Sequence, residues 1–368
     1  GTTTLTAGRG NFLGEPRTAG THSLLVADTV NSALSATQNG IVVVSAAPDA
    51  LDLLSGNGQS AVVDTAFLDP LVFQVSDRFG NPVSGERVDL SAPDLDASAS
   101  LASSFFTTDA LGRGQVDATA NTISGSYSVL AELGTLATAA SLENVADVAT
   151  QLVLSGYPTN VTAGESSPFT VTAQDRFGNV ADSYGGTVNF STSDAQAQLP
   201  SASVLTDGIG NFAAELRTAG QQFLNVTDTV NIGLSATQSD ILVRAGAADS
   251  LTIVGGDDQQ TVANTAFEDG LTVEVRDRFG NAVIDESVLF VAPAAGASGI
   301  LDANVVTTDQ LGRASTTLTA NELVGVFVVE ATAAGLREVF DLTNLSPNVL
   351  PASSLEVPCG ALCGRARG

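Results

Sequence analysis

Short stretches in which apolar and polar residues alternate, separated by turn-forming residues, run through most of the chain. Leu71–Asp77 places Leu, Phe and Val at every second position, and Leu271–Asp277 repeats this pattern with Leu and Val. Alternation with a period of two, bounded by Gly, Asn, Asp and Pro, is typical of antiparallel strands. The Ala-rich stretches carry too much Thr, Ser, Val and Gly to predict a helix. The sequence therefore predicts an all-β protein.

The sequence also repeats itself after 200 residues, almost without insertions or deletions. Asp28–Gln38 returns as Asp228–Gln238, and Thr107–Arg113 returns as Thr307–Arg313. Self-similarity of this kind indicates an array in which one stable module was duplicated. A duplicated block makes everything that it carries twice, whereas an enzyme needs one irregular site. The repeat therefore favours a structural role.

The motif Asp-Arg-Phe-Gly-Asn occurs three times, about once per 100 residues, which is the usual size of an immunoglobulin-like (Ig-like) sandwich. We predict two alternating module types, with a second-type module I at 47–146, a first-type module II at 147–246 and a second-type module III at 247–344. A leading segment (1–46) precedes them and a tail (345–368) follows. The predicted fold is all-β, with tandem Ig-like β-sandwich domains in an extended array.

The leading segment corresponds only to the second half of a first-type module, residues 201–246. Half a sandwich would leave an open hydrophobic face and unpaired strand edges. Three explanations stay open: a fragment cut within a module, non-standard packing on the neighbour, or completion by strands of another protomer, as in donor-strand complementation. The tail bears on the last one, because 341–358 aligns with 141–158, where module II begins. The tail is thus a candidate donor strand or the start of a further module.

The repeated motif begins at Asp77, Asp175 and Asp277 and has a mechanical interpretation. The Asp can accept backbone N–H bonds in an Asx-type turn, and the Gly supplies a positive φ. The Phe is expected to fold back over the end of its own sandwich. We favour a turn that joins strands, with a calcium or ligand role for the Asp as the alternative.

Charge excludes some partners. The chain of 368 residues has 14 basic and 40 acidic residues, a formal net charge of -26 and an isoelectric point near 4.1, and it contains no Lys. Nucleic acid and anionic membrane surfaces both require basic residues, so neither is an expected partner. The acidity fits life in salt or calcium, or a GC-rich genome. No run of about 18 apolar residues predicts a membrane span, and Gly1 opens no signal peptide, so we expect a mature product or an internal piece.

No catalytic, cofactor-binding or metal-binding residues are predicted. His22 is the only histidine and its repeat partner is Gln222, so we expect a plain exposed strand residue. Cys359 and Cys363 form one C-x-x-x-C pair, which is a weak zinc signal; a local or intermolecular disulfide or a cloning remnant stays open. No cofactor is expected, and calcium is the one cation kept as an alternative.

Two further sets of residues are candidates for cation binding or for glycosylation. Acidic turns that could attract a cation, although without EF-hand spacing, are Asp207-Gly208, Asp257-Asp258 and Glu268-Asp269-Gly270. Sequons for N-glycosylation, relevant only in an organism that glycosylates, are at Asn160, Asn189, Asn225 and Asn344. Solvated turn carboxylates are the favoured interpretation of the first set.

The second-type modules resemble a known family. The segments DRFGNPVSGERVDL, FFTTDALGRGQVDAT and SGSYSVLAEL of module I resemble the bacterial Ig-like domains of the invasin/intimin (Big-1) class. In module III, Ala282 replaces the Pro and Phe327 replaces the Tyr of these segments. Module II resembles Ig-like repeats of large bacterial surface proteins and, more distantly, filamin repeats. The resemblance implies an extracellular spacer, adhesin shaft or surface filament, and it carries over no catalytic residues.

These observations predict a structural, non-enzymatic protein at the cell surface. It would be a stalk or filament subunit that self-associates head to tail, with the leading segment and residues 345–358 forming the contact. The alternative is an adhesin whose loops bind a host or surface glycan or protein. No convergent set of acid, base and nucleophile supports an enzyme.

Overall fold

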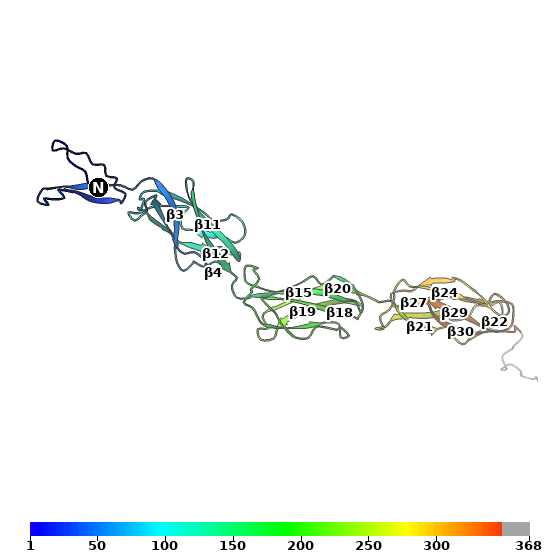
Figure 1. Ribbon diagram of the computed structural model, residues 1–368. Coiled ribbons are helices and arrows are strands. Elements are labelled where there is room, and N and C mark those ends of the chain that lie inside the picture. Colours follow the sequence, from blue (N-terminus) through cyan, green and yellow to red (C-terminus); the bar gives the residue numbers. More distant parts are fainter. Residues whose placement is uncertain (348–368) are drawn as a thin grey trace, which may run out of the picture. The chain divides into compact units, whose positions relative to one another are not determined.

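The computed structural model describes residues 1–347, which contain strands and turns but no helix (Figure 1). The all-β prediction is therefore confirmed. The described chain divides into two compact units, of which the first consists of Gly1–Val153, Thr172–Gly186 and Leu205–Ile209. The second holds the remaining described residues. The predicted module boundaries stay predictions, and modules I to III denote the sequence ranges given above.

Module I lies wholly in the first unit and consists of two facing sheets with a small additional one. The three-stranded sheet has the order β3 (Pro48–Ser55), β5 (Leu71–Asp77), β9 (Arg113–Val116). The five-stranded sheet has the order β4 (Gln59–Val62), β12 (Leu136–Val145), β11 (Gly125–Leu133), β6 (Arg87–Ser91), β8 (Phe105–Thr107). The small sheet pairs β7 (Ala99–Leu101) with β10 (Ala118–Ala120). Only the β4–β12 pair of the five-stranded sheet is parallel.

The core of module I comes from alternate residues of both sheets. On β5, Phe73 and Val75 are fully buried, and Val88 on β6 and Val129 on β11 face them within one apolar cluster. The rings of Phe73 and Phe106 stack with centroids 5.6 Å apart. The alternation read from the sequence thus fixes which side of each strand faces inward, because successive side chains of a strand point to opposite faces.

Module III, in the second unit, repeats this topology strand for strand. Its three-stranded sheet has the order β21 (Ala248–Gly255), β23 (Leu271–Asp277), β27 (Arg313–Thr316). Its five-stranded sheet has the order β22 (Gln259–Val262), β30 (Leu336–Leu345), β29 (Gly325–Ala333), β24 (Ser287–Val291), β26 (Val305–Thr307). The small sheet pairs β25 (Gly299–Leu301) with β28 (Leu318–Ala320). Phe290 and Phe340 are its largest fully buried aromatic side chains.

Module II contributes eight strands, β13 to β20. A five-stranded sheet in the second unit has the order β14 (Asn160–Thr162), β20 (Ser235–Arg244), β19 (Gly220–Asp228), β16 (Thr187–Thr192), β17 (Ser203–Val204). The other sheet has the order β13 (Gln151–Ser155), β15 (Ser166–Gln174), β18 (Ile209–Glu215). Here too, strands with polar outer residues place Leu224 and Val226 of β19 in the interior.

The leading segment forms the hairpin of β1 (Gly20–Ala27) and β2 (Ser35–Val43), a two-stranded sheet with no other partner among the described residues. Its register matches that of β19 and β20, including the irregularity after His22 and after Gln222. Leu24 is 53% exposed, whereas its counterpart Leu224 is fully buried. The described residues therefore leave the inner face of this hairpin exposed, and the three explanations for the half-module stay predictions.

A buried asparagine links two loops of module I. The side-chain amide of Asn144, at the end of β12, donates to the carbonyl oxygens of Ser98 and Ile123 and to Oδ1 of Asn121. Its own Oδ1 accepts a hydrogen bond from the hydroxyl of Tyr127 at 3.0 Å. Burial raises the pKa of Tyr127 to about 12, so this hydroxyl stays protonated and available as a donor.

In module III the same network lacks one member. Asn344 makes the three equivalent donations, but Phe327 stands where module I has Tyr127. The Oδ1 atom of Asn344 is consequently buried without a hydrogen-bond partner among the described residues. The exchange is therefore more than a change in packing, because a buried acceptor without a donor costs about 1–3 kcal/mol.

We predict that Phe327→Tyr stabilises module III by about 1 kcal/mol, because the new hydroxyl supplies the missing donor. The matched reverse change, Tyr127→Phe, should destabilise module I by about 1–3 kcal/mol, because it leaves the Oδ1 of Asn144 unpaired. Urea unfolding of the full chain, followed by amide exchange in each module, measures both effects. An unchanged or lowered stability of module III in Phe327→Tyr would contradict the prediction.

Candidate functional site

The three Asp-Arg-Phe-Gly-Asn segments, here called the junction turns, are the most repeated local structure of the chain. They are Asp77–Asn81, Asp175–Asn179 and Asp277–Asn281. In the first turn, Oδ1 of Asp77 accepts the backbone N–H groups of Phe79 and Asn81, both at 2.9 Å. Gly80 has a φ of 78°, a left-handed conformation that glycine adopts without a steric penalty. The predicted Asx-type turn is thus present.

The second oxygen of this aspartate reaches beyond the turn. Oδ2 of Asp77 accepts the side-chain amide of Asn81 at 2.9 Å and the backbone N–H of Ala46 at 2.8 Å. Ala46 belongs to the connection that enters module I. The two other turns hold their entering connections in the same way, through the N–H of Asp147 at 3.1 Å and that of Gly246 at 2.8 Å.

The side chain of the asparagine at the end of each turn forms hydrogen bonds with the preceding module. Oδ1 of Asn81 accepts the backbone N–H of Ala19 at 2.8 Å, and its Nδ2 donates to the carbonyl of Arg17 at 2.7 Å. Asn281 repeats both bonds, at 2.8 and 2.7 Å, with residues exactly one repeat later, Ala219 and Arg217. The partners of each turn lie in the same compact unit as the turn.

The asparagine of the middle junction turn forms the same two hydrogen bonds with a different loop. Asn179 accepts the N–H of Ser124 and donates to the carbonyl of Thr122, both at 2.9 Å. Arg176 and Asp64 add an ion pair at 3.3 Å, which is exposed and contributes little. Two unrelated loop sequences therefore offer one carbonyl and one N–H, spaced two residues apart, to the same asparagine. These two hydrogen bonds depend on the backbone geometry of the loop and involve none of its side chains.

The phenylalanine of the junction turn does not cover its own sandwich, contrary to the prediction. Phe79 is 38% exposed and lies outside the core of module I. Its ring centre lies 5.5 Å from the guanidinium carbon of Arg17, and that of Phe279 lies 5.4 Å from Arg217, distances at which cation–π attraction acts. A Cβ atom placed on Gly164 would lie 2.5 Å from the ring of Phe279. The rings of Phe79 and Phe279 thus contact the preceding module, and the Arg of their own turn is nearer still, at 4.6 and 4.5 Å.

Hydrogen bonding keeps the junction aspartates ionised. Burial opposes the charged form, but the hydrogen bonds from the Asn side chain, the entering connection and the turn outweigh it and lower the pKa of Asp77, Asp175 and Asp277. Since each oxygen already accepts two N–H donors, a calcium ion at these aspartates would have to displace them. Among residues 1–347, no group of three or more His, Cys, Asp or Glu side chains could hold a metal ion.

The other candidates take ordinary structural positions. His22 is half-buried on β1, and its Nε2 lies 2.6 Å from the carbonyl oxygen of Thr18, the contact that Gln222 makes with Thr218 at 3.0 Å. Asp207 and Gly208 form a tight turn with positive φ. Cys359, Cys363 and the tail from residue 348 lie outside the described residues.

The other acidic turns are peripheral. Oδ1 of Asp257 accepts the backbone N–H of Asp341 at 2.8 Å, and Asp258 has a positive φ in the same turn. Glu268 and Asp269 lie in the exposed turn before β23.

The sequons differ in access. Asn160 and Asn189 are exposed on their strands, and Asn225 is half-buried and hydrogen-bonded. Asn344 is fully buried, with its amide donating three hydrogen bonds. In the folded protein, Asn344 is therefore inaccessible to glycosylation.

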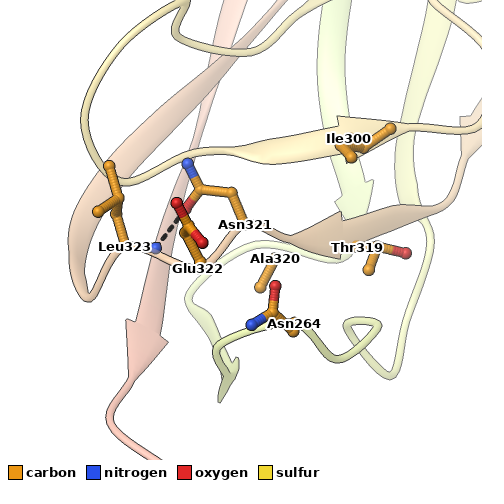
Figure 2. Close-up of a pocket in the computed structure, with 7 residues that line it drawn as sticks. All are labelled: Asn264, Ile300, Thr319, Ala320, Asn321, Glu322 and Leu323. Carbon is orange, nitrogen blue, oxygen red and sulfur yellow. Dashed lines mark hydrogen bonds between the residues drawn. The ribbon is translucent and has the colours of Figure 1, made fainter.

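The end of module III presents the loop that module I offers to the middle junction turn. In module I, Oδ1 of Asn121 fixes this loop by accepting the N–H of Ile123, and Asn321 and Leu323 repeat that bond at 3.1 Å (Figure 2). A shallow hollow of about 390 Å³ lies beside the loop, lined by Asn264, Ile300 and residues 319–323. All three junction turns of the described residues are engaged elsewhere. This loop of module III thus has the same local structure as the loop of module I that binds Asn179.

Comparison with known proteins places this fold. No protein-family model matches the chain. The chain is 27% identical over 220 residues to the inverse autotransporter adhesin YeeJ of Escherichia coli strain K12; this covers 59% of the chain but only 9% of the length of that relative. The solved structure of FdeC, an Escherichia coli adhesin, superposes with a TM-score of 0.53 at 20% identity, over 82% of this chain and 99% of that one. The modules have the fold of invasin-type Ig-like domains.

This finding confirms the predicted fold and the predicted resemblance to the invasin/intimin class. Invasin itself, a bacterial integrin-binding protein, matches with a TM-score of 0.43 and 19% identity over 80% of this chain and 60% of that one. The relatives found are adhesins of the bacterial surface, which agrees with the predicted extracellular location. No helix among the described residues has the length and apolar character needed to span a membrane.

We predict that acid removes the stability that the ionised junction aspartates contribute to the fold. A carboxyl group with a lowered folded-state pKa stabilises the fold fully above its unfolded pKa, near 3.9, and this contribution is lost as the pH falls below about 4 toward the folded-state value. Thermal unfolding of the full chain between about pH 6 and pH 2 measures the loss. Asp277→Asn should lower stability near pH 6, and its difference from the parent should shrink as the pH approaches 2. A constant difference would contradict this assignment.

Proposed function

We propose that the chain is a stalk segment of a surface adhesin-type protein, in which the junction turns couple successive Ig-like modules. The observation that carries this proposal is the threefold recurrence of one contact, in which an Asn side chain bonds an N–H and a carbonyl of the preceding module. A stalk must hold its modules in register under load, and paired bonds at each junction resist bending and twisting.

The coupling should be insensitive to ionic strength. Its hydrogen bonds are short and partly buried, whereas the ion pair of Arg176 and Asp64 is exposed and easily screened. We assign no catalytic role to the chain, since the relatives found are adhesins. Binding of a host or surface glycan or protein, known for adhesins as a class, remains the alternative function.

We predict that Asn81→Ala, Asn179→Ala and Asn281→Ala together loosen the junctions without unfolding the modules. The amides of Ala19, Ser124 and Ala219 should exchange at least about tenfold faster, because each loses its acceptor and opens locally. Exchange at the fully buried strands should be unchanged.

Spin labels at Asn189→Cys and Thr317→Cys, with Cys359 and Cys363 replaced by Ser, report the same loosening as a broader distance distribution between modules II and III. Asn304→Ala, an exposed asparagine whose side chain lies outside the junctions, is the matched control and should leave both readouts unchanged. Equal widths in the triple variant and its parent would refute the coupling role.

We further propose head-to-tail assembly of the subunit, in which residues 345–358 complete the uncovered hairpin of the leading segment. Support comes from the exposed inner side chains of that hairpin, whose counterparts in module II are buried. Because Leu345 ends β30 and pairs with Val262 inside module III, the test deletion is confined to residues 348–358, and it should then abolish polymers in sedimentation and negative-stain microscopy. Monomers and polymers in unchanged ratio after the deletion would exclude this mode of assembly.

A further inference from the structure

Module III exposes a group of aliphatic side chains on the outer face of its five-stranded sheet. This group, called here the aliphatic face, consists of Leu289 and Val291 on β24 and Val326 and Val328 on β29, which are 42%, 49%, 81% and 43% exposed. The two strands are neighbours in the sheet, with Leu289 opposite Thr332 and Val291 opposite Glu330. Polar side chains therefore interrupt the group, and only Val291 lies diagonal to Val328. Their alternate residues form the core, so the strand alternation itself points these four side chains to solvent.

Module I provides an internal comparison, because it has the same strands in the same order. The four equivalent positions, 200 residues earlier, are Asp89, Ser91, Ser126 and Ser128. The fold therefore accepts polar residues at all four positions. On soluble proteins, exposed apolar side chains that line a groove mark a binding surface, and Val326 and Val328 line one. The aliphatic face is thus an addition that neither the core nor the junction turns require.

A hollow of about 780 Å³ adjoins the aliphatic face at Val326 and Val328. Its far wall is the loop that contains Pro293 and residues 295–297, and two carboxylates, Asp258 and Asp341, complete the lining. Asp341 is the direct cross-strand partner of Val328, so an acidic and an apolar side chain lie next to each other on the outer face.

The two carboxylates are also specific to module III. Gly58 and Ser141 hold the equivalent positions of module I. The valines and the aspartates therefore all differ from module I at one place, while the junction turns and the strand order are the same in both modules.

We propose that this hollow and the aliphatic face bind a protein segment whose apolar side chains are flanked by Arg or Lys. The apolar wall offers burial for aliphatic groups, and the two aspartates complement basic side chains. A second copy of this chain does not fit that description, since it has 14 basic against 40 acidic residues and presents the same two carboxylates. This binding surface goes beyond the proposed stalk function and is separate from the junction turns.

The test uses the full chain and fluorescein-labelled synthetic peptides, read by fluorescence anisotropy. One peptide alternates Val with Arg, a second alternates Val with Glu, and a third alternates Ser with Arg. The Val/Arg peptide should bind at least about tenfold more tightly than either control peptide, because only it satisfies both the apolar wall and the carboxylates.

Two variants restore the residues of module I and so are compatible with the fold. Val326→Ser with Val328→Ser should weaken Val/Arg binding about tenfold or more, and Asp258→Gly with Asp341→Ser should remove its salt dependence as well. The reverse changes Ser126→Val and Ser128→Val, combined with Gly58→Asp and Ser141→Asp, should create a second site in module I.

Three results would overturn the proposal. These are no Val/Arg binding at millimolar peptide, equal binding of the Ser/Arg peptide, or binding that both module III variants leave unchanged. Sedimentation of the parent chain tests the competing occupant, because dimers that vanish in Val326→Ser with Val328→Ser would assign the aliphatic face to a second copy. Urea unfolding of each variant verifies that module III is intact.

Discussion

The structure depends on an aspartate whose two oxygens accept N–H donors both from its own turn and from the connection that enters the module. Oδ1 closes the turn, while Oδ2 joins the turn to the entering connection and to the side-chain amide of the following Asn. That amide would otherwise be free to rotate. Because the aspartate accepts from Nδ2 of Asn81, it fixes which way the Asn side chain faces, and thereby directs the remaining Nδ2 hydrogen and Oδ1 toward the preceding module. A local turn and a contact between modules are therefore one hydrogen-bonded unit.

The same constraint explains why the turn occurs in both module types. The turn needs only a carbonyl and an N–H two residues apart on the neighbouring loop, and both the loop at Arg17 and the loop at Thr122 provide them. Loop side chains can vary without loss of the contact. Gly164 is the exception, since the ring of Phe279 occupies the space that any larger side chain would need.

The sequence alone predicted the strands and the repeat, because period-two alternation and a period of 200 residues are visible in the letters. It also predicted the Asx turn, whose donors lie within four residues of Asp77. It could not predict what Asn81 grips, because the partners are backbone atoms more than 60 residues away and carry no residue signature. The Phe was misassigned for the same reason, as its neighbour is another module. The sequence could not show the effect of Phe327, because the acceptor that it leaves unpaired, Oδ1 of Asn344, lies on the next strand.

Duplication makes each copy a control for the other, although modules I and III differ at more than half of their positions. The Asp, Gly and Asn of the junction turns are identical in all copies, as their backbone roles demand. Outer-face positions are free of that demand, so Ser126 and Ser128 can become Val326 and Val328 without effect on the core. An exposed valine is costly to solubility wherever it has no function. Val326 and Val328 lie beside two aspartates that module I lacks, around one hollow, and this combination is the basis of the proposed binding surface. A stalk built from equivalent modules can acquire such a surface on one of them while the junctions continue to carry the load.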